Sequence, residues 1–301
     1  MSLVDTTVAE ARAPGATPLP IEPRYHGWRV LLRDRTAVFG LAVVTVLVLA
    51  AVFAPLLARH DPNAVDILAK HASPSLDHPL GTDNLGRDNL SRVLFGARLT
   101  IGTAVLASGA VALIGIFLGV LAGYLGGVVD AVISRVVDVV LAFPPFLAAL
   151  AVTGVLGPGL GHVGLALIAV WWARYARIVR SAVIAERGKP YIEAARAVGS
   201  SRTRTVRRHL LPNIIAPVVV LTTLDTGDLL IAISSLSFLG LGVRPPAAEW
   251  GAMLSEARAY LSTEPLLMVW PGLALFFLVL GFNLLGDGLR DALDPRTRRR
   301  R

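Results

Sequence analysis

Asp225 and Asp228 are the side chains whose position in this sequence most constrains their chemistry. They lie three residues apart within a long apolar run, so a helix would place them on one face. A carboxylate that faces lipid is costly, and an acid at membrane depth therefore faces a water-filled cavity or another protein. We predict that both acids line a cavity, and a structural hydrogen bond to a partner protein is the alternative.

Other reactive groups in the sequence match no catalytic or metal-binding pattern. His60, His71 and His78 share one polar segment, but their spacings of eleven and seven match no helical ligand pattern. The serines of segment 234–237 have no histidine at an evident companion position, and cysteine is absent. The sequence therefore predicts no catalytic residue, no metal site and no cofactor bound by this chain.

Composition places these groups in a membrane protein. Hydrophobic residues make up 54% of the 301 residues, charged residues make up 17%, and the mean hydropathy is +0.63. A span needs about 20 apolar residues. We predict an all-α polytopic membrane protein with six transmembrane helices, the third broken locally at Pro144–Pro145. The corresponding apolar runs are 37–57, 99–121, 131–155, 161–173, 216–238 and 266–285.

The distribution of basic residues predicts the orientation of these helices. Most of the 29 lysines and arginines lie before residue 37, between 174 and 208, or after 289. The positive-inside rule assigns these segments, and both termini, to the cytoplasmic side of the membrane. The predicted division is a cytoplasmic tail and pre-membrane segment at 1–36, a first transmembrane helix at 37–58, an extracytoplasmic loop at 59–98, a core at 99–285 that contains a polar loop at 190–212, and a basic cytoplasmic tail at 286–301.

Two short helices joined at a glycine are predicted in the polar loop 190–212. Pro190 suits a first helical position, Gly199 suits a helix stop, and Ser200 can cap a second, basic helix that ends at Pro212.

Small residues and a charge pair give two further predictions within the membrane. Gly115, Gly119 and Gly123 recur every four residues, so another backbone can approach that helix face, either in the same chain or in a partner subunit. Arg135 and Asp138 are three residues apart, which favours a mutual ion pair.

The polar loop resembles the EAA loop of ABC importer permeases. The resemblance rests on Glu193, Ala194, Ala195, Gly199 and Leu211–Pro212, and it departs at His209, where the family has an aliphatic residue. Segments 78–98, 126–144, 236–258 and 282–296 extend it over nearly the whole chain. Together they are similar to the second permease subunit of the dipeptide and oligopeptide importers, a family that includes nickel and glutathione importers.

This resemblance implies a type I ABC importer permease fold, a location in the bacterial inner membrane and a set of partners. It implies a heterodimer with a homologous permease, two cytoplasmic ATPases and an extracytoplasmic binding protein. ATP and Mg would be bound by the ATPases, in agreement with the absence of a G-x-x-x-x-G-K-[ST] motif in this sequence. The chain itself would be a non-catalytic transport subunit.

The resemblance also implies roles for individual residues. The EAA-like residues would couple to the ATPases, and the outer loops would contact the binding protein through Asp83, Arg87, Asp88, Glu249 and Trp250. The expected cargo is a di- or oligopeptide, with nickel chelates and glutathione as alternatives. A proton-coupled secondary transporter is the alternative of a different class, but it needs no docking loop and usually shows internal repeats.

Overall fold

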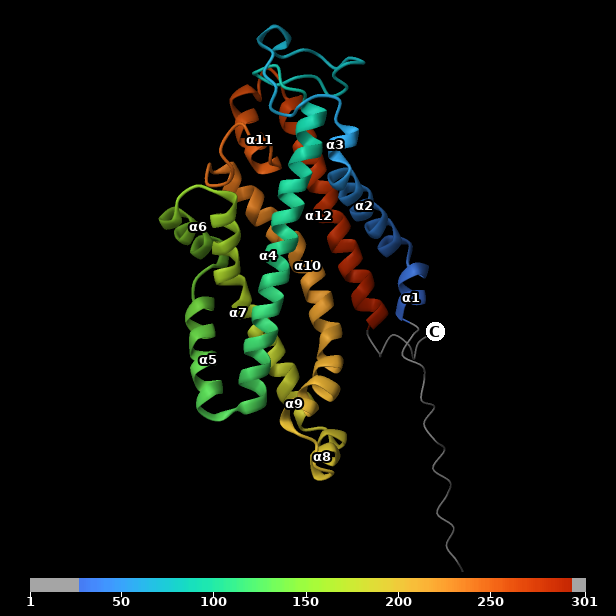
Figure 1. Cartoon of the computed structure of the whole chain (residues 1–301), viewed down its shortest axis with the longest axis vertical. Helices are drawn as coiled ribbons and strands as arrows, with labels where there is room; N and C mark the ends of the chain where they lie inside the picture. Colours follow the sequence, from blue (N-terminus) through green and yellow to red (C-terminus); the bar gives the residue numbers. More distant parts are fainter. Residues whose placement is uncertain (1–26, 294–301) are drawn as a thin grey trace, which may run out of the picture.

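Residues 27–293 form a bundle of helices in the computed structural model, and the predicted tail positions 1–26 and 294–301 lie outside the described residues (Figure 1). Within 27–293 the chain is helical apart from connecting loops and one isolated β-bridge between Thr82 and Asp88. The α-helices are α1 Gly27–Arg33, α2 Arg35–Val52, α3 Ala54–Leu57, α4 Asn89–Leu125, α5 Gly127–Leu141, α6 Pro145–Leu156, α7 Leu160–Arg187, α8 Pro190–Ala197, α9 Arg202–Thr205, α10 Leu211–Phe238, α11 Trp250–Ala257 and α12 Leu266–Leu293.

Four helical stretches in the described chain are long and apolar enough to cross a membrane. They are α2, α4, the continuous stretch Arg202–Phe238 and α12. The pair α5 and α6 adds a fifth only if it counts as one span. The predicted count of six is therefore not confirmed, since α7 has the length but carries several arginines in its second half.

The predicted break of the third span at Pro144–Pro145 is confirmed, and the chain also bends sharply there. Helices α5 and α6 meet at an angle of 87°. Pro144 is in an extended conformation, with φ −56° and ψ 124°, and Pro145 occupies the start of α6. Proline disfavours a helical conformation in the residue before it, so two consecutive prolines end α5 and start a new helix in another direction.

Helix α4 begins ten residues earlier than the predicted second span. Asp88 caps it by accepting a hydrogen bond from the backbone N–H of Ser91 at 2.8 Å. The loop before α4 therefore ends at residue 88, and residues 89–98 of the predicted extracytoplasmic loop are helical.

The most extensive helix packing in the described chain joins α4 to α7. A Cβ atom built on Gly115 would lie 2.2 Å from Cβ of Tyr175, and one on Gly119 would lie 2.7 Å from the carbonyl oxygen of Ala176. A Cβ atom built on Gly123 would likewise lie 2.8 Å from the carbonyl oxygen of Arg180 on α7. Only glycine permits this approach. The glycine repeat therefore packs within the chain, which confirms the intrachain interpretation.

Ion pairs join α7 to α5 on another side of the bundle. Arg177 Nη2 lies 2.6 Å from Asp138 Oδ1, and Arg180 Nη2 lies 2.7 Å from Asp130 Oδ2. The predicted pairing of Asp138 with Arg135 is wrong, because the neighbouring helix supplies a better-placed guanidinium. Arg177 and Asp138 are both exposed, so their pair contributes little to stability.

Candidate functional site

Helix α8 is a short helix held at the end of the bundle opposite the loop 59–88 (Figure 1). Its inward side chain is Ile192, which is fully buried. Ile192 packs in one apolar cluster with Val183 of α7, with Leu210 directly before α10 and with Ile214 in the first turn of α10. The helix is therefore fixed to two long helices by its apolar face.

Polar contacts fix the N-terminal end of α8 to the same two helices. The Tyr191 hydroxyl donates to Glu186 of α7, and Asn213 Nδ2 donates to the Tyr191 oxygen at 2.9 Å. Lys189 Nζ lies 2.6 Å from the other oxygen of Glu186. Burial alone would raise the pKa of Glu186, but the hydrogen bonds from Lys189 and Tyr191 and the lysine charge together lower it below its ordinary value.

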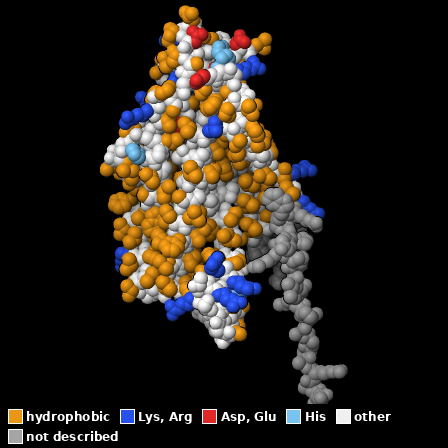
Figure 2. All heavy atoms as spheres, viewed as in Figure 1, with side chains coloured by type: hydrophobic (Ala, Val, Ile, Leu, Met, Phe, Trp, Pro, Cys, Tyr) orange, Lys and Arg blue, Asp and Glu red, His pale blue; other side chains and the backbone are white. Residues whose placement is uncertain are grey.

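The opposite face of α8 is open. Glu193 and Ala194 are exposed, Ala195 is half-buried, and Val198, directly after the helix, is 87% exposed. A short helix that shows small side chains and one carboxylate offers a surface that another protein can approach closely. Figure 2 shows lysine and arginine side chains gathered around this end of the molecule.

Gly199 ends the first helix of the polar loop, as predicted. Its φ of +84° is in the left-handed region that favours glycine. The N-cap of α9 is Ser201 rather than the predicted Ser200, because the Ser201 hydroxyl oxygen accepts from the Arg204 N–H, at 3.4 Å. Gly199 is exposed and nothing lies within 4 Å of the position of an added Cβ.

Pro212 does not end the second helix, which corrects the prediction. Residues Val206–Leu210 form a π-helical turn, in which the Leu211 N–H bonds to the Val206 carbonyl five residues back. Pro212 then falls in the first turn of α10, where its missing N–H is tolerated. The polar loop is thus continuous with a long apolar helix, with Leu211 half-buried and Pro212 exposed.

Asp225 and Asp228 lie in two different environments on α10. Asp225 is 2% exposed, and its Oδ1 accepts from Arg174 Nη1 of α7 at 3.1 Å. Asp228 is exposed and lines an open groove of about 480 Å³. The other residues of this groove are Pro145, Phe146, Trp171, Ile231, Ala232 and Ser235. A three-residue step on a helix turns the side chain by about 60°, which is enough here to separate an intrachain ion pair from an open surface.

Asp83 and Arg87 belong to a buried charge cluster at the other end of the bundle. Arg87 Nε lies 2.6 Å from Asp83 Oδ2, and Arg87 Nη2 lies 2.7 Å from Glu256 Oε2 near the end of α11. Arg92 of α4 lies 3.1 Å from the same oxygen of Glu256. Arg92 and Glu256 were not singled out from the sequence, because nothing local marks two residues 164 positions apart as partners. Opposite charges balance in this cluster, which is what makes their burial tolerable.

Glu249 and Trp250 join α11 to α4. Glu249 is fully buried and caps α11, accepting from the N–H groups of Gly251 and Ala252 at 3.0 Å each. The Trp250 indole N–H donates to the Val93 carbonyl at 2.9 Å. Each of the five predicted binding-protein contacts, including Asp88, which caps α4, is at most 6% exposed. Contact with a binding protein stays a prediction, and the structure gives these side chains partners within the chain.

Glu186→Gln is expected to loosen α8 and to reduce the acid sensitivity of the chain. Because the pKa of Glu186 is lowered in the folded state, its contribution to stability is complete at neutral pH and is lost as the pH falls through that lowered value, below the ordinary 4.5. Thermal unfolding at pH 7 and at pH 3 measures both effects. The variant should unfold a few degrees lower at pH 7 and lose less on acidification, whereas an unchanged pH dependence would contradict this role.

Two family models match most of this sequence. Residues 115–299 match the family of the binding-protein-dependent transport system inner membrane component, and residues 24–74 match the N-terminal TM domain of oligopeptide transport permease C. The first match contains α8 and the groove beside Asp228.

Individual relatives cover nearly the whole chain. It is 39% identical to the dipeptide transport system permease protein DppC of Alkalihalophilus pseudofirmus over 278 residues, a length that covers 92% of this chain and 91% of that protein. It is 42% identical to the nickel transport system permease protein NikC of Escherichia coli K12, over 85% of this chain and 92% of that protein. It is 43% identical to the glutathione transport system permease protein GsiD of Escherichia coli O1:K1, over 92% of this chain and 91% of that protein. The chain therefore belongs to the inner-membrane permeases of binding-protein-dependent ABC importers, as a non-catalytic C-type subunit of the peptide, nickel and glutathione group.

Proposed function

We propose that this permease forms half of the translocation pore for di- and oligopeptides and couples to cytoplasmic ATPases through α8. The observation that carries the proposal is the two-sided character of α8. Its inner face is fixed to α7 and α10 through Ile192 and Tyr191. Its outer face is open at Glu193 and Ala194, and Val198 is exposed directly after it. A push on the open face would be transmitted directly into two long helices of the bundle.

The proposed assembly follows from family membership. The second half of the pore is a homologous permease, two ATPases bind ATP and Mg on the cytoplasmic side, and a binding protein delivers cargo from outside. The end with α8 and both termini then face the cytoplasm, in line with the basic side chains around α8. The loop 59–88 and α11 face the binding protein.

The groove beside Asp228 supports a peptide as cargo. Its walls come from α6, α7 and α10, and they are mostly apolar, with Asp228 as the charged member among the described lining residues. A single carboxylate in an apolar groove suits the ammonium group of a peptide, while the apolar walls tolerate varied side chains. Nickel chelates and glutathione remain the alternative cargoes, since relatives are named for both.

The energy source of transport tests the proposed function. Uptake by the complex reconstituted in vesicles should require ATP and the ATPase subunits, and it should continue when an ionophore collapses the proton gradient. Uptake that persists without ATP and stops with the ionophore would instead identify a proton-coupled transporter.

Asp228→Asn is expected to change cargo selectivity, whereas Asp225→Asn is expected to reduce stability. Asp228 faces the groove, so its neutralisation should lower uptake of peptides with a free ammonium group relative to N-acetylated ones, by about tenfold for the loss of one charged contact. Asp225 pairs with Arg174, so its neutralisation should lower the unfolding temperature without changing that ratio. Measured uptake ratios that are equal in the Asp228 variant and the parent would exclude Asp228 from the path.

A further inference from the structure

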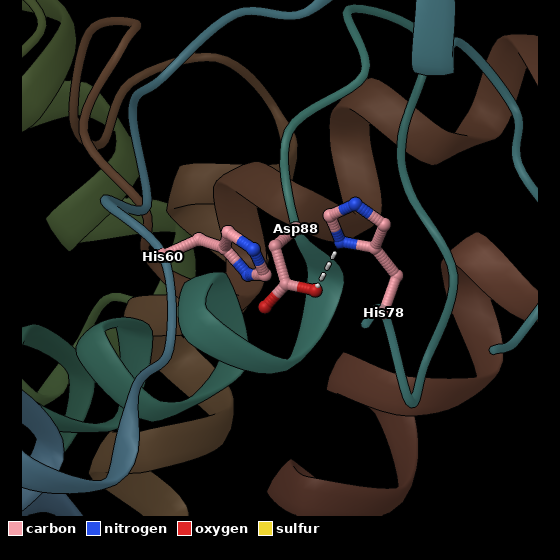
Figure 3. Close-up of side chains that lie close together, drawn as sticks. All are labelled: His60, His78 and Asp88. Atoms are coloured by element: carbon pink, nitrogen blue, oxygen red, sulfur yellow. Dashed lines mark hydrogen bonds and ion pairs between the residues drawn. The ribbon is translucent and has the colours of Figure 1, made fainter. Parts of the chain in front are cut away.

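The fold brings together two histidines that are far apart along the loop before α4. His60 follows α3, and His78 lies eighteen residues later, yet their ring centroids are 4.7 Å apart. The carboxylate of Asp88 joins them, and one ligand atom from each of the three residues lies within 4.8 Å of the other two. Figure 3 shows the two rings on either side of the Asp88 carboxylate. The spacing along the sequence gave no sign of this convergence.

Several hydrogen bonds already hold this group in place. Asp88 Oδ2 accepts from the N–H and the hydroxyl of Ser91, at 2.8 and 2.7 Å, which leaves Oδ1 directed at His78 Nδ1, 3.0 Å away. The backbone N–H of His60 is 3.4 Å from the same Ser91 hydroxyl oxygen. The backbone of His78 is fixed by a turn with Ser75, in which each residue accepts from the other's N–H.

We propose that His60, His78 and Asp88 form a binding site for a divalent transition-metal ion of the zinc type. Two imidazole nitrogens and one carboxylate oxygen are a common set of protein ligands for zinc, with a fourth position open to water. Ligands about 2.0–2.1 Å from a tetrahedral ion are about 3.3 Å apart, which is close to the 3.0 Å between His78 Nδ1 and Asp88 Oδ1. His60 is exposed, so its ring is free to rotate and bring a nitrogen closer to the other two ligand atoms.

The competing interpretation is that His78 simply hydrogen-bonds a helix-capping carboxylate. That contact needs one histidine, and it does not account for the second ring against the same carboxylate. The positive end of the α4 dipole weakens cation binding, but this effect is small beside the strength of metal–ligand bonds. A bound ion would tie the chain after α3, the middle of the loop and the start of α4 to one another, independently of the proposed transport function.

Zinc binding to the full-length chain tests this site. The protein is purified with an affinity tag that contains no histidine, stripped with a chelator and titrated with zinc against a chromophoric competitor. We expect one ion per chain. His60→Ala, His78→Ala and Asp88→Asn should each weaken binding by at least about tenfold. Asparagine is as good a helix cap as aspartate, so Asp88→Asn should keep the start of α4 intact.

His71→Ala is the matched control, because His71 lies in the same loop but packs against the Tyr260 ring at a centroid distance of 5.1 Å. The His71→Ala variant should bind zinc with the same affinity as the parent chain. X-ray absorption of the loaded protein should report two imidazole ligands. No stoichiometric binding by the parent chain, or equal binding by the parent and the His60→Ala, His78→Ala double variant, would overturn the proposal.

Discussion

Replacing Gly115 with leucine is expected to prevent α4 and α7 from packing against each other. The Cβ atom alone would lie 2.2 Å from Cβ of Tyr175 and 3.1 Å from the carbonyl oxygen of Trp172, so the two helices must separate. Overpacking in a core costs about 1–3 kcal/mol and sometimes more, and here the obstacle is partly backbone. We expect a loss of about 3 kcal/mol or more, seen as aggregation on size-exclusion chromatography or a large fall in unfolding temperature.

Gly109→Ala is the control on the same helix. Nothing lies within 4 Å of a Cβ at Gly109, and alanine is the better helix former by up to about 1 kcal/mol. This variant should be as stable as the parent chain or slightly more stable. A Gly115→Leu chain that unfolds at the parental temperature would show that the α4–α7 contact is not as close as the structure has it.

Changes at Gly199 and Glu193 are expected to separate ATP hydrolysis from transport. Valine at Gly199 cannot easily adopt the φ of +84°, which costs about 1–2 kcal/mol and reorients the end of α8. Glu193→Lys replaces the exposed carboxylate by a positive charge beside an already basic segment. Both variants should insert and assemble normally but lose most substrate-stimulated ATPase activity in the reconstituted complex.

Gly188→Ala is the matched control for the Gly199 variant. Gly188 also flanks α8 and has open space around it, but its φ is −83°, which alanine adopts without strain. It should keep parental transport and stimulation. Normal stimulation and transport in both Gly199→Val and Glu193→Lys would remove α8 from the coupling pathway.

Local patterns in the sequence predicted the features that depend on neighbouring residues. The Gly115, Gly119 and Gly123 repeat needs only the helical period to define a packing face. Gly199 as a helix end likewise follows from the conformational freedom of glycine. The all-α fold and the positions of the long apolar helices could be predicted for the same reason.

Features that depend on contacts between distant segments could not be predicted in this way. Asp225 is paired with Arg174 of another helix, and Glu256 is the shared partner of Arg87 and Arg92 in the buried charge cluster. The degree of the bend between α5 and α6 also depends on packing, because proline determines where a helix ends but not the direction of the next one.

Cross-linking from α8 tests most directly whether this helix is the contact with the ATPases. The chain contains no cysteine, so Val198→Cys, at a position that is 87% exposed, gives a unique site for a photoreactive maleimide. Leu76→Cys, at a position that is 90% exposed in the loop 59–88 at the other end of the bundle, is the control. In assembled, ATP-hydrolysing complex, we predict a product containing this chain and an ATPase subunit from Val198→Cys and none from Leu76→Cys. An ATPase product from Leu76→Cys, or none from Val198→Cys, would contradict the account.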